Sequence, residues 1–253
     1  MRHDQIALQL YTVRSLAAQD LPGTLRAVAD AGYGAVELAG LPDTPPRELA
    51  AMLDAAGLRV VASHEGIERL RADGRAVADR LAAVGCPLVI VPWMPEEDRR
   101  EADDVRRFAE ELERYAVALG SHGMRLGYHN HDFEFTPMDG TTAWDVLVQE
   151  LSPEVELELD VYWASVGGRD PVAEIRAHPD RIRLVHVKDR ARALDTDREP
   201  RDAPVGDGVL PMAEIIDASR SAAVAWYVVE QDVPSDPLRD IRRSHEYLTR
   251  LAR

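Results

Sequence analysis

The segment PRELAAMLDAAGLRVVAS, residues 46–63, contains the unit from which the fold is built. It opens with an amphipathic stretch from Pro46 to Ala56, and proline is well tolerated in the first turn of a helix. Gly57 follows at the point where a left-handed residue commonly ends a helix. The run RVVAS (59–63) is short and apolar, as in a buried strand. The segment therefore predicts a helix, a tight turn and a strand in succession.

The same order recurs along the chain. Three further units are Pro22–Ala31 with Gly32 and GAVEL (34–38), Gly74–Val84 with Gly85 and LVIVP (88–92), and Asp103–Leu119 with Gly120 and MRLGYH (124–129). Further strands are predicted at IALQL (6–10), VELELD (155–160), RLVHVK (183–188) and AWYVVE (225–230), and further helices near 171–177, 211–220 and 237–251. Alternating strands and helices predict a parallel sheet with helical crossovers.

Eight such strands in 253 residues favour an α/β fold of one domain, a single (β/α)8 TIM barrel over residues 1–253. An open, doubly wound sheet is the alternative. It would need a glycine-rich turn after an early strand to hold a nucleotide, and QLYTVRSL after the first strand has none.

Composition narrows the class of protein. The formal net charge of −15 disfavours binding to nucleic acid, because the phosphate backbone is also negative. No apolar run reaches the ~18 residues of a membrane span, and the N-terminus lacks the apolar core of a signal peptide. The single cysteine, Cys86, excludes an intrachain disulfide and a thiolate metal cage. We therefore expect a cytoplasmic protein that binds neither a membrane nor nucleic acid.

Polar side chains occupy the ends of the predicted strands. In a barrel these ends meet at one mouth, where active sites lie. The candidates are Glu37, His64, several residues of YHNHDFE (128–134), Asp160, His186 with Lys188, and Glu230. Several carboxylates at one mouth would repel one another unless a cation joined them. Oxygen ligands with an imidazole suit Mn²⁺ or Mg²⁺, and Zn²⁺ or Co²⁺ are also compatible.

Side-chain alternation along a strand tests which residues point inward. In RLVHVK the side chains of Leu184, His186 and Lys188 share one face. In VELELD the same rule places Glu158 on the face of Asp160. A carboxylate buried inside the barrel needs partners, so we expect either a bulge or an arginine in the barrel floor beside Glu158.

Several of these segments together resemble the xylose isomerase-like barrel superfamily, and within it the sugar phosphate isomerase/epimerase family. The most specific are YHNHDFEF (128–135), LELDVYWAS (157–165), LVHVKDR (184–190) and VVEQD (228–232). The resemblance implies one divalent metal ion, with Mn²⁺ preferred, held by Glu134, Asp160, His186 and Glu230. His129 or His131 could take the place of Glu134, because they lie in the same segment.

The resemblance also implies a reaction class. A keto-sugar or inositol-derived substrate would lose a proton next to its carbonyl and form a metal-bound enediolate, which leads to isomerisation or epimerisation. Glu134 and Glu230 are the candidate acid and base, and Lys188 and His131 the candidate proton shuttles. Glu37, His64 and Trp163 are expected to line the substrate pocket. Assembly into a homo-oligomer stays open.

Three other functions are alternatives to this interpretation. A lyase or dehydratase of the same superfamily would act on an inosose or a 3-keto-glycoside through the same intermediate. An endonuclease IV-like phosphodiesterase would need a histidine three residues after Asp160, where this chain has Trp163, and an Asp-x-His where it has Asp207, Gly208 and Val209. A non-catalytic sugar-binding barrel would not need the full set of metal ligands.

Overall fold

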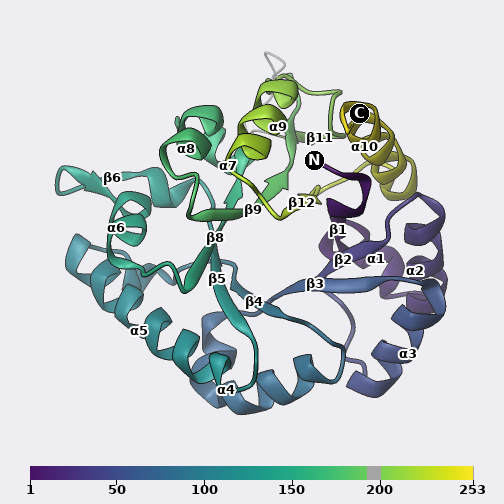
Figure 1. Ribbon diagram of the computed structural model, residues 1–253, viewed down its shortest axis with the longest axis horizontal. Helices are drawn as coiled ribbons and strands as arrows, with labels where there is room; N and C mark the ends of the chain where they lie inside the picture. The colour runs from purple at the N-terminus through teal and green to yellow at the C-terminus, as the bar shows by residue number, and fades with distance from the viewer. Residues whose placement is uncertain (193–200, 253) are drawn as a thin grey trace.

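A computed structural model of the chain describes residues 1–192 and 201–252. Eight parallel strands close into a barrel in the order β1-β12-β9-β8-β5-β4-β3-β2. Their bounds are β1 Ile6–Gln9, β2 Ala35–Leu38, β3 Arg59–His64, β4 Leu88–Val91, β5 Arg125–His129, β8 Val155–Asp160, β9 Ile182–Val187 and β12 Trp226–Val229. The helices surround the strands (Figure 1). The predicted (β/α)8 barrel and all eight predicted strands are confirmed.

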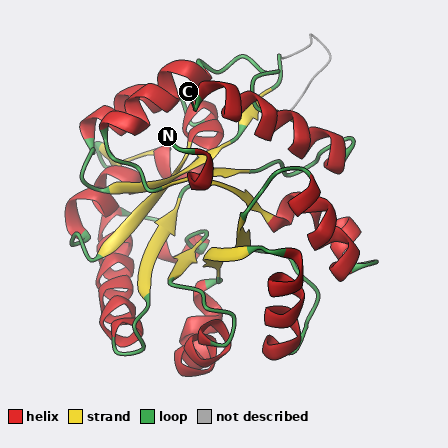
Figure 2. Ribbon diagram, turned by 45° about the vertical axis from the view of Figure 1, so that its right-hand side comes forward, coloured by secondary structure: helices red, strands yellow, loops and turns green. Residues whose placement is uncertain are grey.

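The helices form the outer layer of the molecule (Figure 2). They are α1 Arg14–Ala17, α2 Leu21–Asp30, α3 Pro46–Ala56, α4 Ile67–Ala82, α5 Ala102–Gly120, α6 Ala143–Glu150, α7 Val161–Val166, α8 Pro171–Ala177, α9 Met212–Ser221 and α10 Pro237–Leu251. The sequence did not predict α1, α6 or α7. It also predicted this helix only from Gly74, whereas α4 begins at Ile67 and its backbone is broken at Asp73, just before the predicted start.

Two of the predicted helix ends show what glycine does in this chain. Gly57 follows α3 with φ of 69° and is the expected left-handed cap. Gly120 is not a cap, so that prediction is wrong: α5 runs through it, and Gly123 takes the left-handed conformation instead, with φ of 73°.

The barrel interior begins with a small apolar cluster. It is formed by the buried side chains of Ala7, Ala35, Val61, Ala62, Leu88, Ile90, Leu184 and Val228. A larger core fills the space between the strands and the helices, where Phe108 of α5 meets Tyr128 of β5 edge to face. The inward polar residues therefore lie on top of a packed floor, at the carboxyl ends of the strands.

The segment after β9 is a hairpin. Strands β10 (Asp189–Arg190) and β11 (Asp202–Ala203) pair antiparallel, and residues 193–200 between them lie outside the described residues. The Asp189 carboxylate accepts hydrogen bonds from the backbone N–H groups of Gly206, Gly208 and Leu210. One buried carboxylate thus fixes the chain that returns from the hairpin to α9.

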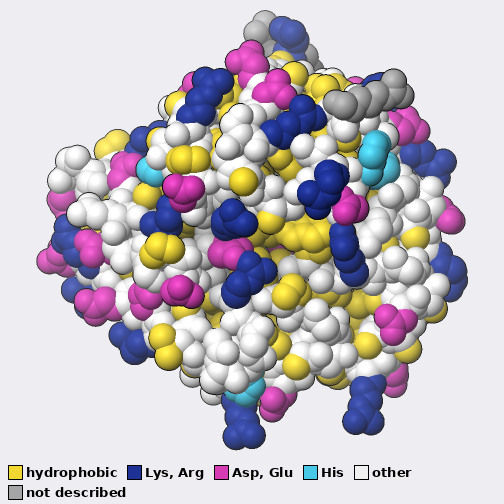
Figure 3. Space-filling view, in the orientation of Figure 1, with side chains coloured by type: hydrophobic (Ala, Val, Ile, Leu, Met, Phe, Trp, Pro, Cys, Tyr) yellow, Lys and Arg dark blue, Asp and Glu magenta, His cyan; other side chains and the backbone are white. Residues whose placement is uncertain are grey.

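The surface carries both signs of charge. On the face in Figure 3, Lys and Arg side chains are interspersed with Asp and Glu side chains. Among the residues that the structure describes, no helix is both long enough and apolar enough to cross a bilayer. The thiol of Cys86 is buried.

Candidate active site

Polar side chains from six strands converge at the carboxyl end of the barrel. Strand β1 ends in Gln9, β2 carries Glu37, and β3, β5 and β8 end in His64, His129 and Asp160, while β9 contributes His186. Glu230 directly follows β12. A cavity of about 510 Å³ opens above them, lined in part by Tyr11, Trp93, His131, Trp163, Glu230 and Asp232. This volume lies within the usual range for small-molecule sites.

Four donor groups meet at the base of this cavity. His129, Asp160, His186 and Glu230 are buried, and each offers a ligand atom within 4.8 Å of the other three. The Nδ1 atom of His186 lies 2.9 Å from Glu230 Oε2 and 4.0 Å from Asp160 Oδ2. Three of these four were predicted as metal ligands from the sequence. The structure brings those three together and adds His129 as the fourth.

Asp160 divides its two oxygens between the fold and the cavity. Its Oδ1 accepts a hydrogen bond from the backbone N–H of Trp163 and caps α7. Its backbone N–H donates to the Asn130 side chain at 2.9 Å. Within residues 1–192 and 201–252, the buried Oδ2 has no hydrogen-bond partner. The cap fixes the carboxylate, and the other oxygen is free to bind a ligand.

The charges of the group are balanced by protons when no ion is bound. Burial alone would lower the pKa of His186, but Glu158 and Glu37 raise it well above its usual value, so this imidazole carries positive charge. Burial raises the pKa of Asp160 to about 7, and the nearby Lys188 offsets only part of that effect. Burial alone would raise the pKa of Glu230 as well, but attraction to Lys188 and His186 lowers it. Burial holds the pKa of His129 well below its usual value, so this imidazole keeps a lone pair for a ligand. Two carboxylates and two imidazoles with an unpartnered oxygen fit a divalent ion.

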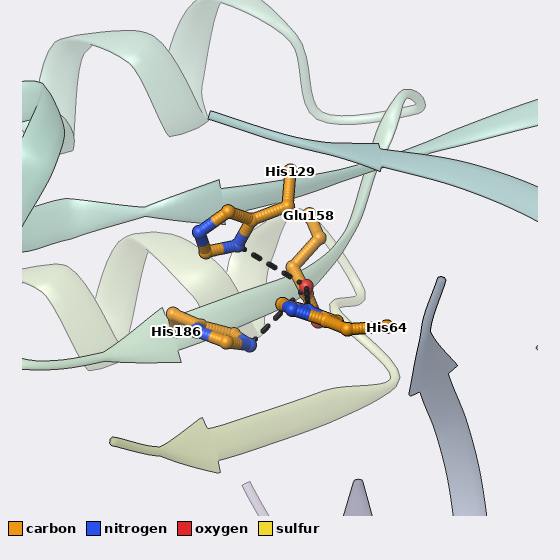
Figure 4. Close-up of side chains that lie close together, drawn as sticks. All are labelled: His64, His129, Glu158 and His186. Carbon is orange, nitrogen blue, oxygen red and sulfur yellow. Dashed lines mark hydrogen bonds and ion pairs between the residues drawn. The ribbon is translucent and has the colours of Figure 1, made fainter. Parts of the chain in front are cut away.

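A second layer of polar groups lies directly beneath. The carboxylate of Glu158 sits among the imidazoles of His64, His129 and His186 (Figure 4). Its Oε2 lies 2.8 Å from His64 Nε2 and 3.2 Å from both His129 Nδ1 and His186 Nε2. Glu158 does point inward, as alternation predicts, but its partners are histidines. Of the two alternatives expected from the sequence, the arginine is not found beside Glu158 within the described residues, and Arg125 pairs with Glu156, earlier on the strand, instead. A register shift does occur at Leu157 and Glu158.

Glu37 belongs to this second layer of polar groups and does not line the cavity. Its side chain is fully buried, and its Oε2 lies 2.8 Å from His186 Nε2 and 3.1 Å from His64 Nε2. Burial alone would raise the pKa of Glu37, but the two histidines lower it. Of the three predicted pocket residues, His64 and Trp163 do line the cavity. Glu37 lies below it, because β2 ends one residue later and its side chain points to the barrel axis.

Glu134 is not part of the donor group. It lies in a short 3-10 turn, Phe133–Phe135, and its buried carboxylate accepts hydrogen bonds from the Tyr128 hydroxyl and the His131 backbone N–H. Burial raises its pKa to about 7. The chain turns after His129, so the glutamate five residues later is carried behind the strand, toward the core on the Tyr128 side.

His131 lines the cavity, and Lys188 is buried behind two residues that line it, Glu230 and Asp232. Lys188 Nζ is fully buried, contacts Asp232, and lies 3.6 Å from Glu230 Oε2 and 5.1 Å from the centre of the Trp163 ring. Burial alone would lower its pKa, but the surrounding carboxylates raise it, so the side chain is a cation. Burial lowers the pKa of His131 to about 4. Its Nδ1 has no hydrogen-bond partner in the part of the chain that the structure describes.

Two features of the site were not fixed from the sequence. His129, the fourth donor, was only one alternative to Glu134, and Glu158 was not expected to be shared by three histidines. Alternation along MRLGYH contains the signal for the first. Tyr128 packs in the outer core, so Gly127 and His129 must face inward. The partners of Glu158 come from three other strands, and only the closed barrel brings them together.

Comparisons with known proteins agree with this fold. Two solved structures of sugar phosphate isomerase/epimerases from Parabacteroides distasonis ATCC 8503 are similar over nearly the whole chain. One has 24% identity and a TM-score of 0.84, covering 97% of this chain and 96% of the other. The second has 25% identity and a TM-score of 0.82, covering 96% of both chains.

A third solved structure, of the IolI protein with a zinc atom, has 14% identity and a TM-score of 0.74, covering 98% of both chains. At that identity the likeness shows the fold alone. No curated protein sequence matches this chain significantly. The family model for the xylose isomerase-like TIM barrel matches residues 25–251. The chain therefore belongs to the xylose isomerase-like TIM barrel family, as its strand-end motifs predicted.

Proposed function

We propose that this chain is a divalent-metal-dependent isomerase or epimerase of a keto-sugar or an inositol-derived ketone. The observation that carries the proposal is the group of four donors, His129, Asp160, His186 and Glu230, at the base of a cavity of about 510 Å³. A buried carboxylate oxygen without a partner is costly in a fold. Asp160 Oδ2 at the mouth of the barrel has no partner among the described residues, as expected if a bound ligand supplies the missing contact.

These four residues would hold the ion. Two imidazoles with two carboxylates suit Mn²⁺, Co²⁺ or Zn²⁺ better than Mg²⁺, which prefers oxygen ligands. Zinc is the metal named for the IolI structure. When bound, the ion supplies Lewis-acid polarisation of a carbonyl and stabilises negative charge on its oxygen. To take part, His186 must give up any proton on Nδ1, so binding would release protons.

The chain itself supplies the groups that move the proton. The neutral imidazole of His131 lines the cavity and has a free Nδ1, which makes it the candidate acceptor. The Lys188 ammonium is the candidate donor. It does not line the cavity, so its proton would pass through Asp232, which it contacts and which does line the cavity. We do not retain Glu134 as an acid or base, since its two contacts, Tyr128 and His131, tie it away from the cavity.

The walls of the cavity suit a carbohydrate. Trp163 and the half-exposed Trp93 present aromatic faces, on which the C–H groups of a sugar ring can pack. Gln9, His64 and Asp232 supply hydrogen-bonding groups for hydroxyls. This mixture of apolar walls and a few convergent polar groups is typical of small-molecule sites.

The same arrangement also suits a lyase or dehydratase acting on an inosose or a 3-keto-glycoside. Both reactions start with removal of a proton next to a carbonyl, and they differ in whether a group then leaves from the neighbouring carbon. Product analysis separates them: epimerisation and isomerisation conserve the mass of the substrate, whereas elimination produces an unsaturated ketone and a free leaving group.

The test is proton exchange. A panel of ketoses, inososes and 3-keto-glycosides is incubated in D2O with the purified chain and Mn²⁺, and ¹H NMR records loss of the α-proton signal. We expect exchange with at least one member, and a loss of roughly 100- to 10,000-fold in Glu230→Gln. Glu156→Gln, a glutamate at the opposite end of the barrel, is the matched control. Exchange at the wild-type rate in Glu230→Gln, or without any divalent ion, would contradict the proposal.

A further inference from the structure

Two carboxylates lie sealed beneath the donor group, and neither touches the cavity. The side chains of Glu37 and Glu158 are fully buried inside the barrel. Burying a carboxylate is unfavourable unless charged or hydrogen-bonding partners surround it. Packing alone does not require either of them, because the layer below is filled by alanine, valine and leucine side chains. Their position calls for another role.

Both carboxylates converge on one nitrogen of His186. Its Nε2 lies 2.8 Å from Glu37 Oε2 and 3.2 Å from Glu158 Oε2. The other nitrogen, Nδ1, faces Glu230 and Asp160 at the base of the cavity. The imidazole therefore connects the two layers of polar groups: Nδ1 faces the donor group, and Nε2 faces Glu37 and Glu158.

The chemistry of imidazole couples these two contacts. A nitrogen that binds a metal must offer a lone pair, so in a neutral ring the proton must be on the other nitrogen. Ionised carboxylates only accept hydrogen bonds. Glu230 lies 2.9 Å from Nδ1, so without an ion both nitrogens can carry a proton. When an ion takes the lone pair of Nδ1, the two carboxylates at Nε2 hold the remaining proton there. Partners of this kind commonly orient metal-binding histidines.

His64 braces the same two carboxylates from the opposite side. Its Nε2 lies 2.8 Å from Glu158 Oε2 and 3.1 Å from Glu37 Oε2, and its ring stacks on His186 at 5.4 Å with a 6° angle between the planes. Its Nδ1 is 3.2 Å from the Gln9 side chain. Each carboxylate thus bridges two parallel imidazoles, which limits rotation of the His186 ring.

We infer that Glu37 and Glu158 are positioning residues, which fix the tautomer and the orientation of His186 so that its Nδ1 faces the cavity. This inference rests on the proposed function, because it assigns His186 the role of a metal ligand. A competing interpretation is a second ion among His64, His129, Glu158 and His186, whose donor atoms are also close together. His186 would then bind two cations and lose both ring protons, and the number of ions per chain decides between the two.

The experiment measures metal binding and the His186 ring directly. The purified chain is freed of metal with a chelator and titrated with Zn²⁺ by calorimetry, and ¹⁵N-histidine-labelled protein is followed by NMR with and without Zn²⁺. The variants are Glu37→Gln, Glu158→Gln and the double substitution. Glu158→Asp keeps the charge and serves as the conservative variant. Glu156→Gln, on the same face of β8 but paired with Arg125, is the control.

We expect one zinc ion per wild-type chain and, with zinc bound, an Nε2–H tautomer for His186. Each Glu→Gln change should weaken zinc binding roughly 10- to 100-fold and shift the His186 ¹⁵N signals toward a mixture of tautomers. Glu158→Asp should recover part of the affinity, and Glu156→Gln should leave it within about twofold of the wild type. If Glu37 and Glu158 only supported the fold, the Glu→Gln substitutions would lower thermal stability and leave the His186 tautomer unchanged.

Several outcomes would overturn the inference. These are a wild-type His186 that carries its proton on Nδ1 with zinc bound, two ions per chain, or Glu→Gln variants with wild-type affinity and unchanged ¹⁵N signals. The first and second need no variant, so they hold even if a variant fails to fold. Failure of the proposed function looks different: the wild-type chain would bind no divalent ion, or would bind one and exchange no α-proton.

Discussion

The barrel interior has two layers that come from the same strands and differ completely in chemistry. The lower layer contains Ala7, Ala35, Ala62, Leu184 and Val228. Two residues further along the same strands stand Gln9, Glu37, His64, His186 and Glu230. Because side chains alternate along a strand, a step of two keeps the same inward direction. Position along the strand alone therefore separates the residues that pack from those that form the site.

The two layers also contribute differently to folding. The lower layer buries apolar surface, which favours the folded state by about 25 cal/mol per Å². The upper layer removes carboxylates from water, which opposes folding unless partners compensate. Glu37 and Glu158 have histidine partners, and Asp160 Oδ2 lacks a hydrogen bond within the described residues. Substitutions in the upper layer should therefore change function, and those in the lower layer stability.

The largest effect is expected for Asp160→Asn. Asparagine caps a helix as well as aspartate does, so α7 should keep its N-terminus. The charge that the donor group needs is lost, and we expect α-proton exchange to fall roughly 100- to 10,000-fold. Urea unfolding should change by no more than about 1 kcal/mol. Asp160→Ala, which removes cap and charge together, shows how much the cap contributes.

A substitution in the lower layer should reverse that pattern. Leu184 is fully buried two residues before His186. Leu184→Ala should lower the free energy of unfolding by about 2–5 kcal/mol, through lost apolar burial and a cavity. Zinc affinity, measured by calorimetry on the folded protein, should stay within about threefold, because the carboxylates that hold His186 remain in place. A large loss of affinity with little loss of stability would erase the distinction between the layers.

The sequence contained nearly all of the fold and most of the site. Four strands were predictable because each is a short apolar run after a helix and a glycine, and the other four because similar short, largely apolar runs recur along the chain. Helices α1, α6 and α7 were not predicted. Helix α7 follows β8 without an intervening loop, and the residue that caps it, Asp160, is also a site residue. All four donors lie at or next to strand ends, which made them candidates, and the family resemblance then selected Asp160, His186 and Glu230 as ligands.

The remaining parts of the site depend on contacts between distant segments. Glu134 was taken for a donor because it lies in a motif that the family shares, but the 3-10 turn at Phe133–Phe135 carries it away. Alternation from Tyr128 would have selected His129. The environment of Glu37 and Glu158 combines two kinds of contact. Strand β8 pairs with β5 and β9, and β2 pairs with β3, but Glu158 reaches His64 and Glu37 reaches His186 only across the closed barrel.

Glu134 gives a smaller effect, with a defined dependence on pH. Its pKa of about 7 in the fold exceeds the ordinary value of 4.5, so the folded state binds its proton more tightly than the unfolded state does. The stability from this group is complete below about pH 4.5 and is lost as the pH rises through about 7. Glu134→Gln mimics the protonated carboxyl. The free energy of unfolding of this variant should exceed that of the wild type by an amount that grows from about pH 5 to pH 8 and reaches up to about 3 kcal/mol. A difference that does not vary with pH in urea unfolding would contradict this.

The smallest effect is expected at Glu156, the first of three acids on the inward face of β8. It pairs with Arg125. The Glu156 side chain is only 11% exposed, but that of Arg125 is 53% exposed, so water screens the pair and its contribution is roughly 0–1 kcal/mol. Glu156→Gln should therefore change the free energy of unfolding by less than about 1 kcal/mol. The change should shrink further in about 1 M salt, which screens exposed charges.

The three acids of β8 then form a graded series along one strand. Asp160→Asn should strongly reduce α-proton exchange, and Glu158→Gln should weaken metal binding. Glu156→Gln should do neither, although all three substitutions replace an acid on the same face of the strand. If contact with the donor group decides the effect, the series holds at low and high salt alike. If Glu156→Gln weakened zinc binding as much as Glu158→Gln, the summed charge of the barrel would set the affinity. The division between the two layers would then lose its physical basis.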